Sequence, residues 1–134
     1  MCVFRFVKWI DAGLPIQLFG DGSAARDFTY VDDIALGTIA ALADVGYEVI
    51  NLGGGGTPIS MNQLIAACGE LLGKKPIVQK LDTFKADMAT TSADISKAKQ
   101  LIGWSPKTGF DTGLKASVSW YVDNKPWTEK IVLP

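Results

Sequence analysis

The sequence contains no histidine among its 134 residues, and this absence limits its chemistry. Histidine is the most frequent general base near neutral pH and the most frequent metal ligand, so chemistry that depends on it is excluded. Only two cysteines occur, Cys2 and Cys68, each in an apolar helical pattern without a second ligand nearby. We therefore expect no metal site and no disulfide framework, and we place the chain in the reducing cytoplasm.

An excess of basic charge and a long apolar run are also missing. Thirteen Lys and Arg residues are balanced by fourteen Asp and Glu residues, which gives a net charge of −1 without any five-residue basic cluster. Nucleic acid is therefore not an expected partner, because binding its phosphates requires a positive patch. The longest uncharged apolar run, at 34–43, is far shorter than the roughly 20 residues that span a bilayer. We expect no membrane partner.

The composition that remains is typical of a globular protein. Apolar residues make up 48% of the chain and charged residues 20%, which excludes intrinsic disorder and low-complexity architectures. The length fits one domain, and we treat residues 1–134 as a single truncated domain. The chain begins inside an amphipathic helix and offers only three or four strands, which favours a piece of a larger α/β protein.

Hydrophobic spacing and turn residues predict the following elements: helices at 2–12, 34–43, 61–72 and 94–102, a last helix through Leu114 and Tyr121, and strands at 15–19, 47–52 and 77–81. Asp32 and Asp111 are expected to cap the helices that follow them. Ser60 and Gln63 form a capping box, and Gly73 ends that helix. The alternation of strands and helices predicts an α/β fold with a small mixed sheet and flanking helices.

Two glycine motifs suggest nucleotide binding. Residues 20–25 satisfy the G-x-G-x-x-A dinucleotide fingerprint, but residues 26–30 continue as an extended segment where the fingerprint needs a helix, so we favour a plain turn. The four glycines at 53–56 follow a predicted strand and could bring N–H groups to a phosphate. Residues 57–59 separate them from the next helix cap, so a flexible strand exit is an equal alternative.

A Tyr-x-x-x-Lys motif, Tyr121 to Lys125, is typical of a catalytic tyrosine whose pKa a helical lysine lowers. Pro126 disfavours helical geometry at Lys125, so we do not expect the two side chains to share a helix face. We therefore interpret Tyr121 as part of a helix end that packs on the core.

Arginine is scarce and thus informative, since only Arg5 and Arg26 occur. Arg26 follows a glycine turn in a loop, where a planar fork can bind a diphosphate, although an ion pair with a neighbouring aspartate is the alternative. Arg5 is expected on the solvated face of a helix. Gln17 and Phe19 lie on the same side of their strand, an amide beside an aromatic ring that could bind a base. From the pattern alone, Phe19 in the core is the alternative.

The blocks P-I-Q-L-F-G-D-G at 15–22 and R-D-F-T-Y-V-D-D-I-A at 26–35 resemble the carboxyl-terminal half of the NAD-dependent nucleotide-sugar epimerase/dehydratase family, the extended short-chain dehydrogenases. The later blocks N-L-G-G-G, A-D-I-S-K-A and G-W-S-P-K follow in the order of UDP-glucuronate 4-epimerase-like members. The resemblance covers essentially the whole chain. It implies the carboxyl-terminal substrate-binding portion of an extended Rossmann-type epimerase, without the NAD-binding half.

The resemblance also implies residue roles. Arg26 matches the arginine that contacts the diphosphate, Gln17 and Phe19 match the strand that lines the base, and Asp87 matches an acidic residue near the ribose and diphosphate. The family's cofactor fingerprint and catalytic Tyr and Lys lie in the amino-terminal half. We therefore expect a nucleotide-sugar partner, no cofactor in this chain with NAD in the parent enzyme, and no catalysis by the chain alone.

Two alternatives stay open. The chain could be a stand-alone binding or assembly module or a remnant, and the parent could be a nucleotide-sugar dehydratase or decarboxylase instead of an epimerase. If the nucleotide-binding half is missing, apolar surface on the helix at 32–43 and an unpaired strand at 47–52 become uncovered. We therefore expect a homo-oligomer, formed by strand pairing or exchange.

Overall fold

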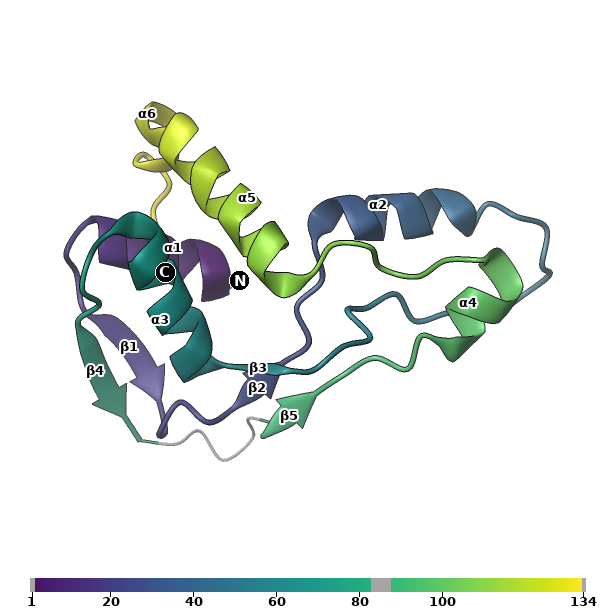
Figure 1. Ribbon diagram of the computed structural model, residues 1–134, viewed down its shortest axis with the longest axis horizontal. Coiled ribbons are helices and arrows are strands. Elements are labelled where there is room, and N and C mark those ends of the chain that lie inside the picture. Colours follow the sequence, from purple (N-terminus) through teal and green to yellow (C-terminus); the bar gives the residue numbers. More distant parts are fainter. Residues whose placement is uncertain (1, 83–87, 134) are drawn as a thin grey trace. The chain divides into compact units, whose positions relative to one another are not determined.

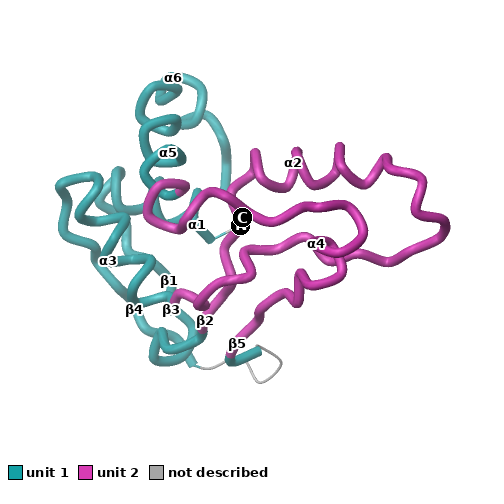
Figure 2. Tube along the Cα trace, turned by 45° about the vertical axis from the view of Figure 1, so that its right-hand side comes forward, with its two compact units in different colours: residues 1–24, 60–89, 114–134 teal, residues 25–59, 90–113 magenta. Residues whose placement is uncertain are grey.

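A computed structural model describes residues 2–82 and 88–133 of the chain (Figure 1). The chain divides into two compact units, of which unit 1 comprises 1–24, 60–89 and 114–134, and unit 2 comprises 25–59 and 90–113 (Figure 2). The elements in chain order are α1 (Cys2–Asp11), β1 (Ile16–Phe19), β2 (Ala25–Arg26), α2 (Val31–Ala40), β3 (Ile59–Ser60), α3 (Met61–Leu72), β4 (Val78–Leu81), β5 (Thr90–Thr91), α4 (Ser96–Ile102), α5 (Phe110–Asp123) and α6 (Lys125–Thr128). The α/β prediction is confirmed.

The sheet of unit 1 consists of two parallel strands, β1 and β4, in the register Ile16 to Val78 and Phe19 to Leu81. Ile16 and Leu18 are buried, at 0% and 3% exposure, and pack into the core of the unit. Because side chains alternate along a strand, Gln17 and Phe19 point to the opposite face. Phe19 is 53% exposed, so it is not a core residue.

Helices complete the core of unit 1. Its other buried apolar residues come from three helices: Phe6, Val7 and Ile10 of α1, Leu64, Ile65 and Cys68 of α3, and Leu114, Val118 and Tyr121 of α5. The predicted capping box of α3 is present, with Ser60 and Gln63 exchanging hydrogen bonds, and Gly73 adopts the left-handed conformation at φ 62°. The boundaries of α3 agree with the prediction because local groups satisfy both ends: the Ser60 and Gln63 side chains at the amino end, and the backbone N–H groups of Gly73 and Lys74 at the carboxyl end.

Lys8 joins the beginning of unit 1 to its end. Its ammonium group donates hydrogen bonds to the carbonyls of Thr128 and Glu129, both at 3.0 Å, and to that of Ile131. These carbonyls belong to the last residue of the short helix α6 and to residues just after it, where helical backbone leaves acceptors unsatisfied. A cation at this position satisfies them and complements the helix dipole.

In unit 2, helix α2 is buried through a polar residue and a glycine. Asp33 and Gly37, one turn apart, are its two buried residues. The indole N–H of Trp104 donates to the Asp33 carbonyl at 2.9 Å, and the Thr108 N–H donates to the Asp33 carboxylate at 2.8 Å. A side chain at Gly37 would press on Leu52 and Trp104 at 2.9 Å. Asp33 and Gly37 therefore form the buried side of α2, and most of its large apolar side chains lie on the exposed side.

The second small sheet includes the parallel pair β2 and β5, with Ala25 opposite Thr90 and Arg26 opposite Thr91. β3, whose first residue Ile59 belongs to unit 2, lies on the other side of β2. None of the helices within residues 2–82 and 88–133 combines the length and apolarity that a bilayer span requires.

Several predicted element boundaries are wrong. Residues 47–52 do not form a strand: Tyr47 and Val49 are 95% and 70% exposed, and no strand among residues 2–82 and 88–133 pairs with them. Helix α2 begins at Val31 with Tyr30 as its N-cap, so Asp32 is not the cap and is exposed in the first turn. Asp111 likewise lies inside the first turn of α5. Helix α2 ends at Ala40, three residues early.

The turn after β1 is anchored on α3. Gly22 has φ +81°, and its carbonyl accepts from the Asn62 N–H at 3.1 Å. The Asn62 side chain donates to the Asp21 carbonyl at 3.0 Å. A Cβ at Gly22 would overlap that side chain, whereas Gly13, at φ +68°, has open space around it.

These two glycines make a matched pair for a stability test. We expect Gly13→Ala to lower the free energy of unfolding by about 1–2 kcal/mol, the cost of left-handed backbone in a non-glycine residue. Gly22→Ala should cost about 1 kcal/mol more, because it also displaces Asn62 from the turn. Urea denaturation of both variants measures the difference, and equal costs would contradict the anchoring role of Asn62.

Candidate functional site

The exposed side of β1 borders a hollow of about 260 Å³ within unit 1. Gln17, Phe19, Arg5 and Trp9 contribute to its lining, together with Met61 of α3. An aromatic ring that is half exposed beside an amide can stack on a flat ring and form hydrogen bonds to its edge. The predicted pair Gln17 and Phe19 is therefore brought together at one cavity.

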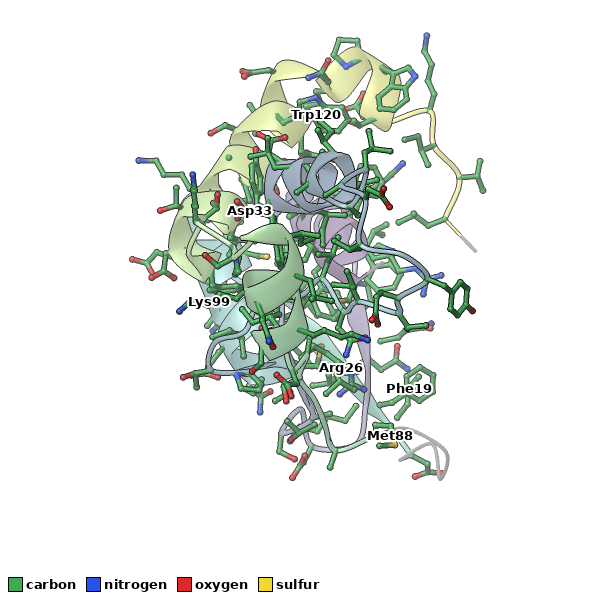
Figure 3. The ribbon with its side chains drawn as sticks, turned by 90° about the vertical axis from the view of Figure 1, so that its right-hand side faces the viewer. Phe19, Arg26, Asp33, Met88, Lys99 and Trp120 are labelled. Atoms are coloured by element: carbon green, nitrogen blue, oxygen red, sulfur yellow. The ribbon has the colours of Figure 1, made fainter. Side chains whose placement is uncertain are left out.

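A second hollow of about 540 Å³, also within unit 1, lies at the carboxyl ends of β1 and β4. Phe19 lines it too, with Asp21, Lys80 and Asp82 as its charged residues. Figure 3 shows Met88, another lining residue, next to Phe19. Phe19 is thus a wall common to both hollows, and ligands typically bind beyond the carboxyl ends of parallel strands.

The other two predicted site residues, Arg26 and Asp87, are not among the described residues that line the two hollows of unit 1. Arg26 lies in β2 of unit 2, where its side chain is half-buried and donates to the carbonyl of Ala25 at 2.8 Å. The carboxylate of the neighbouring Asp27 accepts hydrogen bonds from the backbone N–H groups of Gly55 and Ala93. Asp87 lies outside the described residues. The roles of Arg26, Gln17, Phe19 and Asp87 therefore stay predictions.

Arg5 occupies a different environment from the solvated helix face expected for it. Its guanidinium lies 5.9 Å from the centre of the Trp9 ring, and both residues line the 260 Å³ hollow. Helical spacing contained this signal, because Arg5 and Trp9 are four residues apart and lie on the same side of α1. The proximity of α1 to Phe19 is a tertiary feature that the sequence pattern did not reveal.

The G-x-G-x-x-A segment does not fit an NAD pyrophosphate. Ser23 N–H donates to the Asp21 carboxylate at 2.8 Å, and the Asn62 side chain fills the space beside Gly22. The segment continues into β2, not into a helix whose N-terminus could hold a phosphate. The prediction of a plain turn is confirmed.

The four glycines at 53–56 allow close packing against Asp27 and Ala93, so the segment is neither a phosphate-binding loop nor a flexible strand exit. The Asp27 carboxylate accepts from the N–H of Gly55 at 2.9 Å and of Ala93 at 3.3 Å. A Cβ at Gly54 would overlap that carboxylate, and one at Gly53 would overlap Ala93. An aspartate therefore occupies the place of an anion, and its negative charge disfavours a phosphate there.

The side chains of Tyr121 and Lys125 meet at one carboxylate in unit 1, although the helix is interrupted between them as predicted. Lys125 lies 2.8 Å from Asp11, and the Tyr121 hydroxyl donates to Asp11 at 3.3 Å. Burial and the negative charge of Asp11 raise the pKa of Tyr121 to about 12. A catalytic tyrosine needs the opposite shift, so the structural interpretation of Tyr121 is supported.

Comparison with known proteins places this arrangement in a family. Residues 1–53 match the model of the NAD dependent epimerase/dehydratase family. The chain is 55% identical over 124 residues to a UDP-glucuronate 4-epimerase from Thermodesulfobacterium geofontis, an alignment that covers 92% of this chain and 38% of that protein. It aligns with the carboxyl-terminal part of such enzymes.

Solved structures agree. The UDP-glucuronic acid 4-epimerase of Bacillus cereus, in complex with UDP-glucuronic acid and NAD, is 35% identical at a TM-score of 0.83, over 92% of this chain and 40% of that one. The UDP-glucose 4-epimerase of Thermotoga maritima with UDP-glucose is 31% identical at a TM-score of 0.83, over 93% and 40%. The chain belongs to the NAD-dependent epimerase/dehydratase family and spans about 40% of the length of these relatives.

The Asp11 cluster predicts a pH dependence of stability. Partial burial acts to raise the pKa of Asp11, but its contacts with Lys125 and Lys74 outweigh burial and leave the pKa below the ordinary 3.8. The charged carboxylate therefore stabilises the folded state above pH 3.8, and this contribution is lost as the pH falls through the folded-state pKa.

We expect Asp11→Asn to be less stable than the wild type at pH 6, with the gap closing as the pH falls from 4 toward 2. Urea denaturation across this range measures it. Asp44→Asn, at an exposed residue of unit 2, is the control for loss of one negative charge. A gap that is constant with pH would contradict the assignment.

Proposed function

We propose that this chain binds the nucleotide part of a UDP-sugar for an NAD-dependent sugar 4-epimerase and does not catalyse epimerisation by itself. The observation that carries the proposal is the position of Phe19, half exposed beside Gln17 at the hollow on the exposed side of β1. The relatives named above are epimerases of UDP-sugars, which favours this parent over a dehydratase or decarboxylase.

The size and composition of the hollow support a base as its occupant. Its volume of about 260 Å³ suits a single flat ring better than a complete dinucleotide. The Phe19 ring supplies a stacking surface, and the Gln17 amide supplies both a donor and an acceptor. The 540 Å³ hollow, which Phe19 also lines together with three charged residues, offers room for the remainder of the nucleotide.

Catalysis would be supplied by groups outside this site. Within the described residues both side chains of the Tyr-x-x-x-Lys motif contact the Asp11 carboxylate, and the pKa of Tyr121 is raised to about 12. The role left to the chain is to hold the nucleotide, and binding energy from this remote part positions the sugar for reaction. Arg26 is proposed as the diphosphate contact on the strength of the family resemblance.

Isothermal titration calorimetry with UDP-glucuronate tests this proposal. We expect the wild-type chain to bind, and Phe19→Ala to weaken binding by about 5- to 100-fold, the range of base stacking on an aromatic ring. Tyr47→Ala removes an aromatic ring that is 95% exposed and lines neither hollow, so it should leave the affinity unchanged. Absence of binding by the wild-type chain would refute the proposal.

We also propose that the chain self-associates through α2. Asp33 and Gly37 form the buried side of this helix, so Val31, Leu36 and Ile39 are 68%, 54% and 63% exposed, followed by Leu42 at 84%. A run of large apolar side chains on one helix marks an interaction surface. A net charge of −1 adds little repulsion between copies. Association by pairing of the segments at 47–52 is no longer expected, because that segment is not a strand.

Light scattering with size-exclusion chromatography at micromolar concentration measures the association. We expect a dimer or larger species in the wild type and a monomer in the double variant Ile39→Lys with Leu42→Lys. Val49→Lys, at an apolar residue outside α2 that is 70% exposed, should not change the wild-type mass. A monomeric wild type would show that the exposed face of α2 does not bind a second copy.

A further inference from the structure

Arg5 is held in a defined orientation on α1. Its guanidinium lies 5.9 Å from the centre of the Trp9 ring, a distance at which cation–π attraction acts. Trp9 is in turn fixed by Phe6, whose ring centre is 6.3 Å away and which is only 6% exposed. The core of unit 1 therefore supports Trp9, and Trp9 supports the guanidinium.

Arg5 also shares a cavity with the two residues proposed to bind the base. Arg5 and Trp9 from α1, and Gln17 and Phe19 from β1, line the same 260 Å³ hollow. A ring stacked on Phe19 in this hollow has its edge toward side chains from these two elements. The available polar groups differ in chemistry, because the guanidinium only donates hydrogen bonds while the amide of Gln17 both donates and accepts.

This difference separates the pyrimidines. Uracil and thymine carry a carbonyl oxygen at C4, which accepts a hydrogen bond, whereas cytosine carries an amino group there, which donates. The Gln17 amide can rotate to present either its oxygen or its N–H groups, so it can pair with either base. The Arg5 guanidinium can only donate, so opposite the amino group of cytosine both groups are donors and neither finds an acceptor. We propose that Arg5, oriented by Trp9, selects a pyrimidine with a carbonyl at C4 and rejects cytosine in the hollow of Gln17 and Phe19, an inference that rests on the proposed nucleotide-binding function.

The ratio of two affinities tests the selection, measured by calorimetry with UDP and with CDP. We expect the wild-type chain to bind UDP at least about tenfold more tightly than CDP, the effect of one hydrogen bond with a charged donor. Arg5→Gln should bring the ratio close to one, because a second amide can accept from cytosine. Arg5→Lys keeps a donor and should keep part of the preference.

Two further variants separate selection from other effects. Lys115→Gln removes a cation from an exposed position of α5 that lines no part of this hollow, and it should leave the ratio unchanged. Trp9→Leu removes the support of the guanidinium and should lower the ratio while Arg5 is still present. A merely structural role of Arg5 would shift the urea midpoint and weaken both ligands alike.

The outcomes distinguish this inference from the proposed function. If UDP and CDP both bind in a manner that Phe19→Ala weakens, and Arg5→Gln reduces both affinities by the same factor or neither, then Arg5 does not select the base and only the inference is wrong. If the wild-type chain binds neither UDP nor CDP, the proposed function fails and the inference fails with it.

Discussion

The burial of Ile16 and Leu18 in β1 is the constraint from which the candidate site follows. Parallel pairing with β4 fixes the strand, and alternation then forces Gln17 and Phe19 to the opposite side. A register shift of one residue would bury the amide and expose two aliphatic side chains, destroying the core and the site together. The core and the candidate site are therefore specified by the same four residues.

Aspartates organise much of the rest. Asp11 gathers two lysines and a tyrosine in unit 1, while in unit 2 Asp27 binds the glycine segment and Asp33 binds the Trp104 to Thr108 loop. Each carboxylate satisfies donors that would otherwise need water or a ligand. In the loops whose glycine content suggests phosphate binding, the N–H groups of Ser23 and Gly55 are thus already bound by aspartates, which is why the proposed ligand site is the side-chain cavity around Phe19.

Local sequence signals predicted the features that local interactions determine. The capping box at Ser60, the left-handed Gly73 and the glycine turn after β1 all depend on hydrogen bonds or backbone conformations close in sequence, so residue spacing was sufficient to predict them. The predicted strand at 47–52 failed because a strand needs a neighbour, which no local pattern reports. Asp33 was missed as a buried anchor, since its partners lie more than 70 residues away. The family resemblance supplied the predicted base-lining role of Gln17 and Phe19. The proposed role of Arg5 in base selection became visible only from the packing of α1 beside β1.

The ammonium of Lys8 binds carbonyls more than 120 residues further along the chain. During synthesis on the ribosome, these acceptors are therefore polymerised more than 120 residues after Lys8. The pairing of β1 with β4 also waits for about sixty residues to be added. Unit 1 therefore closes only after α5 and α6 have been polymerised, and until then the nascent α1 lacks part of the packing that buries Phe6, Val7 and Ile10.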